Sequence, residues 1–200
     1  MTSLFRLTEL YAGGPGSGCQ GPNCGRPKTQ LQSMLEQSSK AWGPKNLWSL
    51  LAKHGHAGVV APFSAAELKQ LKTLVKSAGF KGAGDCKIGF CFMNAQRLAI
   101  VAHVHRSEHV ELVEGLVTVH GVPLDHSWIE YNGKVYDPTL ALYQADKAPV
   151  LKRGDGRYEP EYFGVNVPKD AVIKHQLATG MYSPLSHSWG NEELQKRIWK

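Results

Sequence analysis

The sequence lacks any long apolar segment and any strong cluster of charge. No stretch approaches the roughly 18–20 apolar residues that a membrane helix needs, and residues 1–10 lack the apolar core of a secretion signal. The net charge is +6, but the basic residues are scattered and no run of five occurs. We therefore expect a cytosolic chain that does not use a membrane, and we regard nucleic acid as an unfavoured partner.

Cysteine is also scarce, with Cys19, Cys24, Cys86 and Cys91 as the only four. They form two pairs, each with four intervening residues. A disulfide framework is not expected in a chain of this length without a secretion signal. A zinc site made of all four thiolates is one alternative, at the upper limit of zinc spacing, and unrelated thiols are the other. We expect neither a metal nor a cofactor.

Glycine and proline are concentrated near the N-terminus. Residues 12–28 contain six Gly and three Pro. Such a segment has too few apolar residues to offset the entropy cost of ordering the chain. We predict a flexible tail over residues 1–28 and a single α+β domain over residues 29–200. The sequence Gly-Gly-Pro-Gly-Ser-Gly at 13–18 resembles a tag found near the ends of many tailed-bacteriophage proteins. That resemblance implies a phage or prophage protein located in host cytoplasm or virion, with phage structural proteins as candidate partners.

Apolar spacing predicts helices in the first half and strands in the second. The helices are expected near residues 31–42, 46–55, 64–79, 91–102 and 168–178. Strands are expected at 110–119, with a bulge at Glu114-Gly115, and at 162–167. The predicted fold class is α+β, with a helical N-terminal half and a central Cys-bearing helix packed on an antiparallel sheet.

A short hairpin over residues 124–139 organises the second half. Asn132-Gly133 is the dipeptide that favours a two-residue type I′ turn, because both positions need positive φ. This turn sets the register of the strands on either side. Since side chains alternate between faces, His126, Trp128 and Asp137 should share one face, with His126 and Asp137 within side-chain reach.

Cys91, His126 and Asp137 together fit a catalytic triad. A cysteine in the first turn of a helix lies near free N–H groups that stabilise a thiolate, and the same groups can hold an oxyanion. A histidine from a facing strand moves the proton, and a carboxylate fixes its tautomer. Each residue also has a simpler interpretation. Cys91 could be a small core residue, His126 a structural histidine, and Asp137 the start of a turn.

Four segments carry a resemblance to the papain-like/transglutaminase-like cysteine enzyme superfamily. They are GFCFMNA at 89–95, VEG at 113–115, PLDHSW at 123–128 and GKVYDPT at 133–139. The resemblance implies a cysteine that opens the central helix, and a His-x-Trp strand beside the strand that carries the aspartate. It implies thiol acyl transfer on a protein or peptide, by proteolysis, amide hydrolysis or cross-linking. Cys91 would be the nucleophile, His126 the general base and acid, and Asp137 the orienting residue.

The oxyanion hole departs from this pattern. Papain-like enzymes place a glutamine about six residues before the cysteine, and Asp85 stands there in this sequence. Backbone N–H groups or Asn94 would have to take its place. Cys86 is an alternative nucleophile, or a redox partner of Cys91.

Other polar clusters have weaker interpretations. The spacing of His103, His105 and His109 does not place all three on one helix face, so a solvated loop is favoured over a metal site. Glu111 and Glu114 could be ligands or the polar face of a strand. Two rival functions also stay open: a catalytically inactive phage structural or accessory protein on the same fold, and a basic nucleic-acid-binding module.

Overall fold

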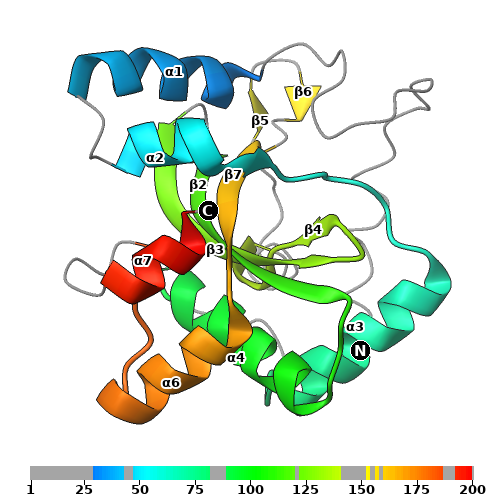
Figure 1. Ribbon diagram of the computed structural model, residues 1–200. Coiled ribbons are helices and arrows are strands. Elements are labelled where there is room, and N and C mark those ends of the chain that lie inside the picture. The colour runs from blue at the N-terminus through cyan, green and yellow to red at the C-terminus, as the bar shows by residue number, and fades with distance from the viewer. Residues whose placement is uncertain are drawn as a thin grey trace.

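The structure is a computed structural model of the chain, described here over residues 29–42, 47–81, 89–119, 122–140, 152–153, 156–157, 160–186 and 192–199. It has an α+β fold with a curled five-stranded antiparallel sheet and several helices (Figure 1). The predicted tail over residues 1–28 lies outside the described residues. Of the helices described, none is both long enough and apolar enough to cross a membrane.

The helices lie mainly before the sheet in sequence, as predicted. Their bounds are α1 Gln30–Trp42, α2 Leu47–His54, α3 Ala65–Ser77, α4 Cys91–Val104, α6 Lys169–Thr179 and α7 Glu192–Ile198. The helix predicted near residues 168–178 is confirmed as α6. It ends at Gly180, which adopts a left-handed conformation (φ 67°) and whose N–H bonds Gln176 O. In Figure 1, α1 and α2 lie side by side at one end of the sheet, and α4 and α6 lie at the other.

The main sheet has the strand order β1-β7-β2-β3-β4. Its strands are β1 His56–Ala57, β2 Val110–Val119, β3 Val122–Tyr131, β4 Lys134–Tyr136 and β7 Tyr162–Val167. A separate pair consists of β5 Lys152–Arg153 and β6 Gly156–Arg157. The predicted strands at 110–119 and 162–167 are therefore confirmed.

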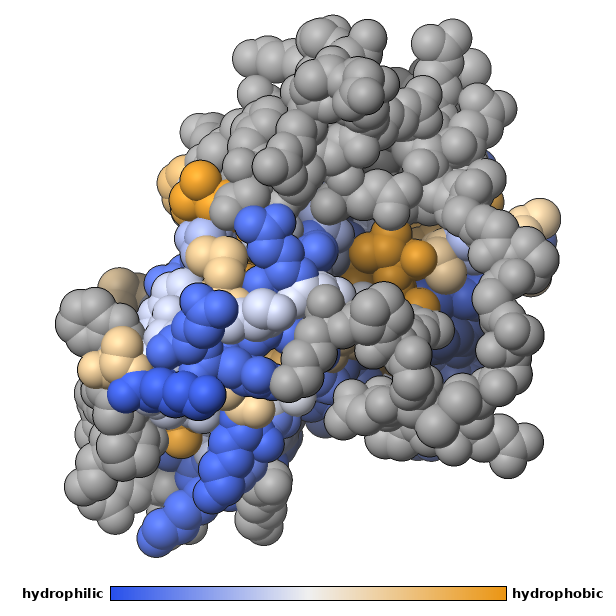
Figure 2. All heavy atoms as spheres, turned by 90° about the horizontal axis from the view of Figure 1, so that it is seen from above, coloured by the Kyte–Doolittle hydropathy of each residue, from blue (hydrophilic) through white to orange (hydrophobic). Residues whose placement is uncertain are grey.

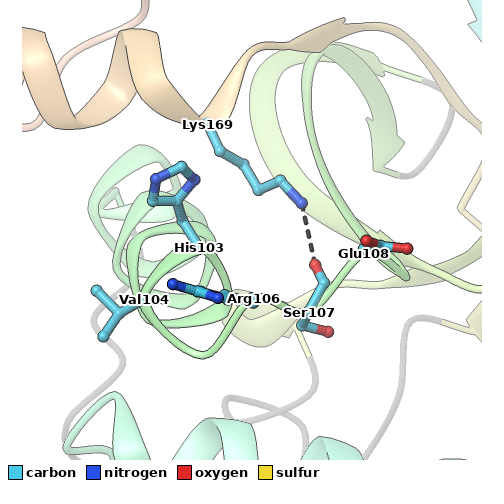
Figure 3. A pocket seen from close by; sticks show the side chains of 6 residues that line it. All are labelled: His103, Val104, Arg106, Ser107, Glu108 and Lys169. Carbon is cyan, nitrogen blue, oxygen red and sulfur yellow. Dashed lines mark hydrogen bonds between the residues drawn. The ribbon is translucent and has the colours of Figure 1, made fainter.

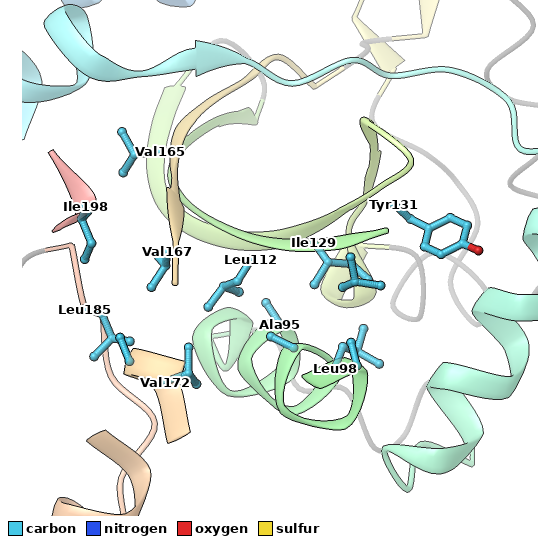
Figure 4. Packing of buried hydrophobic residues seen from close by; sticks show 14 of the residues in the cluster. Ala95, Leu98, Leu112, Ile129, Tyr131, Val165, Val167, Val172, Leu185 and Ile198 are labelled. Carbon is cyan, nitrogen blue, oxygen red and sulfur yellow. The ribbon is translucent and has the colours of Figure 1, made fainter. Parts of the chain in front are cut away.

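The segment after β1 links the two edges of the sheet. Gly58 N donates to Tyr162 O on β7 at 2.9 Å, and Val59 O accepts from Val135 N on β4 at 2.9 Å. The sheet is therefore strongly curled, so that the segment after β1, at one edge, also contacts β4 at the other edge (Figure 4). This curl gives the sheet a convex outer face and a concave inner face.

The two faces bury different clusters. On the outer face, Ala95 and Leu98 of α4 pack beneath Leu112 and Ile129 (Figure 4). The inner face holds a smaller cluster, which contains Val113, Val117, Trp128, Val135 and Tyr162. Seen from above, hydrophilic side chains cover most of the described surface, and apolar ones form smaller groups (Figure 2).

The predicted hairpin is confirmed in turn type and register. Asn132 has φ 51° and Gly133 has φ 71°, as a type I′ turn requires. Tyr131 pairs with Lys134, and the next pairs along β3 and β4 follow in the predicted order. Outside the sheet, Lys134 Nζ contacts Glu67 Oε2 at 3.0 Å, which fastens the hairpin to the first turn of α3.

The N-terminus of α3 is a capping box. Ser64 Oγ accepts from Glu67 N at 3.3 Å, and Ser64 N donates to Glu67 Oε2 at 2.7 Å. The pKa of Glu67 is lowered to about 2, first by the Ser64 backbone hydrogen bond and then by the side chains of Lys134 and Asn132. One carboxylate therefore anchors both the helix start and the hairpin turn.

The bulge predicted at Glu114-Gly115 is wrong. β2 pairs without interruption with β3 on one side and β7 on the other. Gly115 is needed instead for a close approach of strands, because a Cβ there would lie 2.2 Å from Phe163 O and 2.5 Å from Gly164 Cα. A glycine within a strand does indicate a special backbone position. Here the reason is the close approach of the neighbouring strand and not an inserted residue.

Candidate active site

Cys91 is the first residue of α4, as the sequence predicts. The preceding residue, Phe90, occupies the N-cap position but provides no side-chain hydrogen bond to the helix. The N–H groups of the first turn therefore have no side-chain cap from this residue. Cys91 is a free thiol and is 8% exposed. As the first residue of α4, Cys91 belongs to the helix terminus that carries a partial positive charge.

His126 and Asp137 form a close buried pair. The distance from His126 Nε2 to Asp137 Oδ2 is 2.6 Å. His126 is on β3, and Asp137 follows the last residue of β4. The hairpin register brings the two together because both project from the same face. The predicted diagonal contact is therefore present.

The carboxylate of Asp137 is held by four donors. Oδ1 accepts from the backbone N–H groups of Thr139 and Leu140 at 2.9 and 3.0 Å. Oδ2 accepts from Tyr162 Oη at 3.0 Å and faces His126 Nε2. Asp137 thus both starts a turn and orients a histidine, two roles that the sequence left as alternatives. Such a fully bonded carboxylate has a fixed orientation.

His126 interacts with Cys91 as well as with Asp137. Burial is the largest single influence and lowers the pKa of His126, but the charge and hydrogen bond of Asp137 and those of Cys91 together outweigh it. The net result raises the pKa of His126 from 6.5 to about 10. Since Asp137 engages Nε2, Nδ1 is the ring nitrogen that remains for Cys91. Asp137 and Cys91 therefore both favour the protonated, imidazolium form of His126.

Two aromatic residues hold the imidazole in place. Trp128 stacks on His126 with ring centroids 6.4 Å apart and an interplanar angle of 19°. Tyr162 meets Trp128 edge-on at 5.1 Å. Sequence reasoning identified Trp128 but missed Tyr162 as a member of the site. Its position on a predicted strand was correct, but nothing in the local sequence indicates that β7 curls towards Asp137.

Asn94, which the sequence offered as an oxyanion donor, contacts the segment after Asp137. Its Nδ2 donates to Thr139 Oγ1 at 3.1 Å, and the residue is fully buried. The amide group therefore connects α4 to the turn after Asp137. Asp85 and Cys86 lie outside the described residues, as do Cys19 and Cys24, so the zinc and redox alternatives for the cysteines are untested.

Glu114 lies on the outer face and binds the C-terminal part of the chain. Its Oε2 accepts from Leu185 N and Ser186 N, each at 2.8 Å, and its Oε1 accepts from Gln96 Nε2 at 3.1 Å. Burial raises the pKa of Glu114, against the opposing effect of these hydrogen bonds. The interpretation of Glu114 as a ligand is therefore replaced by a structural role.

The histidine-rich stretch lies at the opposite end of α4 from Cys91. His103, Arg106 and Lys169 line an open pocket of about 570 Å³ there (Figure 3). Lys169 Nζ donates to Ser107 O at 3.1 Å and to Val110 O at 2.7 Å, so it stabilises the connection from α4 to β2. Among the residues that the structure describes, no group of three or more His, Cys, Asp or Glu is arranged to hold a metal ion.

Comparison with known proteins adds no assignment. No family model matches the chain, and no curated protein or solved structure shows significant similarity to it.

Proposed function

We propose that the protein is a thiol-dependent acyl-transfer enzyme: a cysteine peptidase, an amidase or a transglutaminase-like enzyme. The observation that carries the proposal is the pairing of His126, which bonds Asp137 at 2.6 Å and also interacts with Cys91. A buried imidazolium beside a thiol favours the thiolate form, which is the nucleophile. This is the arrangement that thiol acyl transfer requires.

The proposed reaction has two stages. The Cys91 thiolate attacks the carbonyl carbon of an amide, and His126 gives its proton to the departing amine as the carbon–nitrogen bond breaks. Neutral His126 then takes a proton from water, or from an acceptor amine. That nucleophile attacks the thioester and releases Cys91, while Asp137 stabilises the imidazolium in both stages. No oxidant, metal or cofactor is needed.

Backbone groups are the best candidates for holding the oxyanion. Asn94 Nδ2 is engaged by Thr139, whereas the first-turn N–H groups of α4 lack a side-chain cap from Phe90. These groups lie next to the nucleophile, and such donors stabilise the developing negative charge of a tetrahedral intermediate.

The α+β fold and the Cys, His, Asp order support a papain/transglutaminase-like arrangement with a protein or peptide substrate. The sequence resemblances add a phage origin, with host cytoplasm or virion as the location.

The alternative is a catalytically inactive protein on the same fold. The observation in its favour is burial, since Cys91 is 8% and His126 is 7% exposed. A large substrate would have little access to these two side chains. A nucleic-acid-binding module has no comparable structural support, and it predicts an affinity that falls steeply with salt.

Covalent trapping separates the enzyme from the inactive alternative. The purified protein is mixed with p-nitrophenyl acetate, a small activated acyl donor that suits a partly covered thiol, and peptides are mapped by mass spectrometry. The proposal predicts that the wild type forms an acetyl thioester on Cys91 and then hydrolyses it. It predicts no acetyl group at this position in Cys91→Ala and slow turnover in His126→Gln. Acetylation of Cys91 at the same rate in His126→Gln would contradict it.

A further inference from the structure

Tyr162 reaches the candidate site from a strand that does not adjoin the hairpin. β2 lies between β7 and β3, yet Tyr162 Oη donates to Asp137 Oδ2 at 3.0 Å because the sheet curls. The residue is 4% exposed and its ring packs against Trp128. The hydroxyl therefore makes a directed contact inside an otherwise apolar cluster.

The hydroxyl shares one carboxylate oxygen with the imidazole. His126 Nε2 and Tyr162 Oη both contact Oδ2, while Oδ1 is occupied by two backbone N–H groups. Each donor that bonds an ionised carboxylate stabilises part of its negative charge. The more charge the tyrosine takes from Oδ2, the less strongly Asp137 holds the proton of His126.

We propose that Tyr162 is a positioning residue of the thiol site, which fixes Asp137 Oδ2 on His126 and limits how strongly this carboxylate holds the His126 proton. The inference rests on the proposed function, because the strength with which Asp137 holds the proton matters only if His126 must both bind and release a proton during the reaction. An imidazolium held too tightly by its carboxylate is a poor acid for the leaving amine. In addition, only a small fraction of such a histidine is neutral, and only the neutral form can act as the base when the thioester is hydrolysed.

The structure already shows the opposing influences on this histidine. The pKa of His126 is lowered by burial and raised to about 10 by Asp137 and Cys91. Removal of the tyrosine hydroxyl leaves Oδ2 with a single donor, so the carboxylate should hold the proton more strongly. The pKa of His126 should rise further, and the turnover step that needs neutral His126 should slow.

Tyr162→Phe tests the inference, with Tyr131→Phe as the matched control. Tyr131 is also 4% exposed and in the same sheet, but it lies on the outer face and its hydroxyl bonds Gln70. Two quantities are measured: the titration of His126 by NMR of its ring protons, and the pH profile of p-nitrophenyl acetate turnover. Assignment of the His126 signal uses His126→Gln, because the chain contains nine histidines.

The expected result is a higher His126 pKa in Tyr162→Phe and a kcat roughly threefold to tenfold lower at pH 8, with little change in KM. Tyr131→Phe should change neither quantity. A Tyr162→Phe protein whose His126 titration and kcat match those of Tyr131→Phe would overturn the inference. If Tyr162→Phe does not fold, global 3-fluorotyrosine labelling makes the hydroxyl a stronger donor and should lower the His126 pKa. No shift on labelling would overturn the inference equally.

Failure of the proposed function gives a different result. In that case no acetyl thioester forms on Cys91 in the wild type, whatever the NMR titration shows. Failure of the inference alone leaves the thioester on Cys91 and its dependence on His126 intact, and only the difference between Tyr162→Phe and Tyr131→Phe disappears.

Discussion

Asn94 Nδ2 donates to Thr139 Oγ1 at 3.1 Å, and this contact joins the helix that begins with Cys91 to the turn that holds Asp137. Both residues are buried, at 0% and 4% exposure. Cys91 and Asp137 lie 46 positions apart in the sequence. A side-chain bridge between those elements therefore fixes the relative positions of the site's two ends.

The coupling across this bridge can be measured directly. Asn94→Ala, Thr139→Val and the double variant form a cycle, in which the free energy of unfolding is obtained from urea denaturation. We expect a coupling energy of about 1 kcal/mol, the net value of a buried neutral hydrogen bond. The exposed pair Arg197–Asp170, at 2.7 Å, is a control that should couple more weakly. Additive effects of Asn94 and Thr139 would contradict the bridge.

Gly164 should be intolerant of any side chain. A Cβ there would lie 2.7 Å from Glu114 O and 2.7 Å from Trp128 Cη2. Gly164→Ala must displace the indole that stacks on His126, so we expect about 1–3 kcal/mol of destabilisation from overpacking and a changed near-UV circular dichroism spectrum.

Gly133→Ala provides the contrast for Gly164. Gly133 has φ 71°, and a Cβ added there would meet no other group within 4 Å. Only backbone strain of about 1–2 kcal/mol therefore applies. Its near-UV spectrum should match the wild type. A spectral change in Gly133→Ala, or none in Gly164→Ala, would show that Trp128 is not constrained as described.

The parts of the site that depend on local sequence could be predicted, and the parts that depend on curvature could not. Asn132-Gly133 specifies its own turn, and the register of His126 and Asp137 follows from it by alternation. Tyr162 joins the site only because the whole sheet curls, a property spread over five strands. Gly115 shows a related limit, since a glycine in a strand indicates a special backbone position without revealing which neighbour requires it.

Glu114 should make the free energy of unfolding depend on pH at values above those at which an ordinary carboxyl group titrates. Burial raises its pKa above the value of 4.5 expected in the unfolded chain. Its stabilising contribution is complete below pH 4.5 and is lost as pH rises through the higher pKa of the folded state. We expect the free energy of unfolding to fall more steeply above pH 4.5 in the wild type than in Glu114→Gln.

The same substitution should also weaken the fold at its C-terminal contacts. In Glu114→Gln, one side-chain oxygen can still accept from Leu185 N and Ser186 N, but the new NH₂ group faces the NH₂ of Gln96. We expect a loss of about 1–3 kcal/mol at pH 5 in urea denaturation. Identical pH slopes in the two proteins would contradict the assignment of this effect to Glu114.

His126 contributes a second pH dependence in a higher range. Its pKa is raised from 6.5 to about 10, so its contribution to stability is complete below pH 6.5 and disappears progressively towards pH 10. Thermal denaturation between pH 7 and 10 should show a wild-type decline that is reduced in His126→Gln. An equal decline of thermal stability in both proteins would show that a group other than His126 titrates in this range.

The central claim is that His126 activates Cys91, and the rate of Cys91 alkylation by iodoacetamide tests it most directly. An ordinary thiol is only about 1% thiolate at pH 6.5. Peptide mapping separates Cys91 from the other three cysteines, and the urea-unfolded chain supplies the rate of an unactivated thiol. We predict that native Cys91 reacts at least tenfold faster than in the unfolded chain, and that His126→Gln removes this advantage. Native Cys91 that reacts no faster than in the unfolded chain, or equally fast in His126→Gln, would contradict the account.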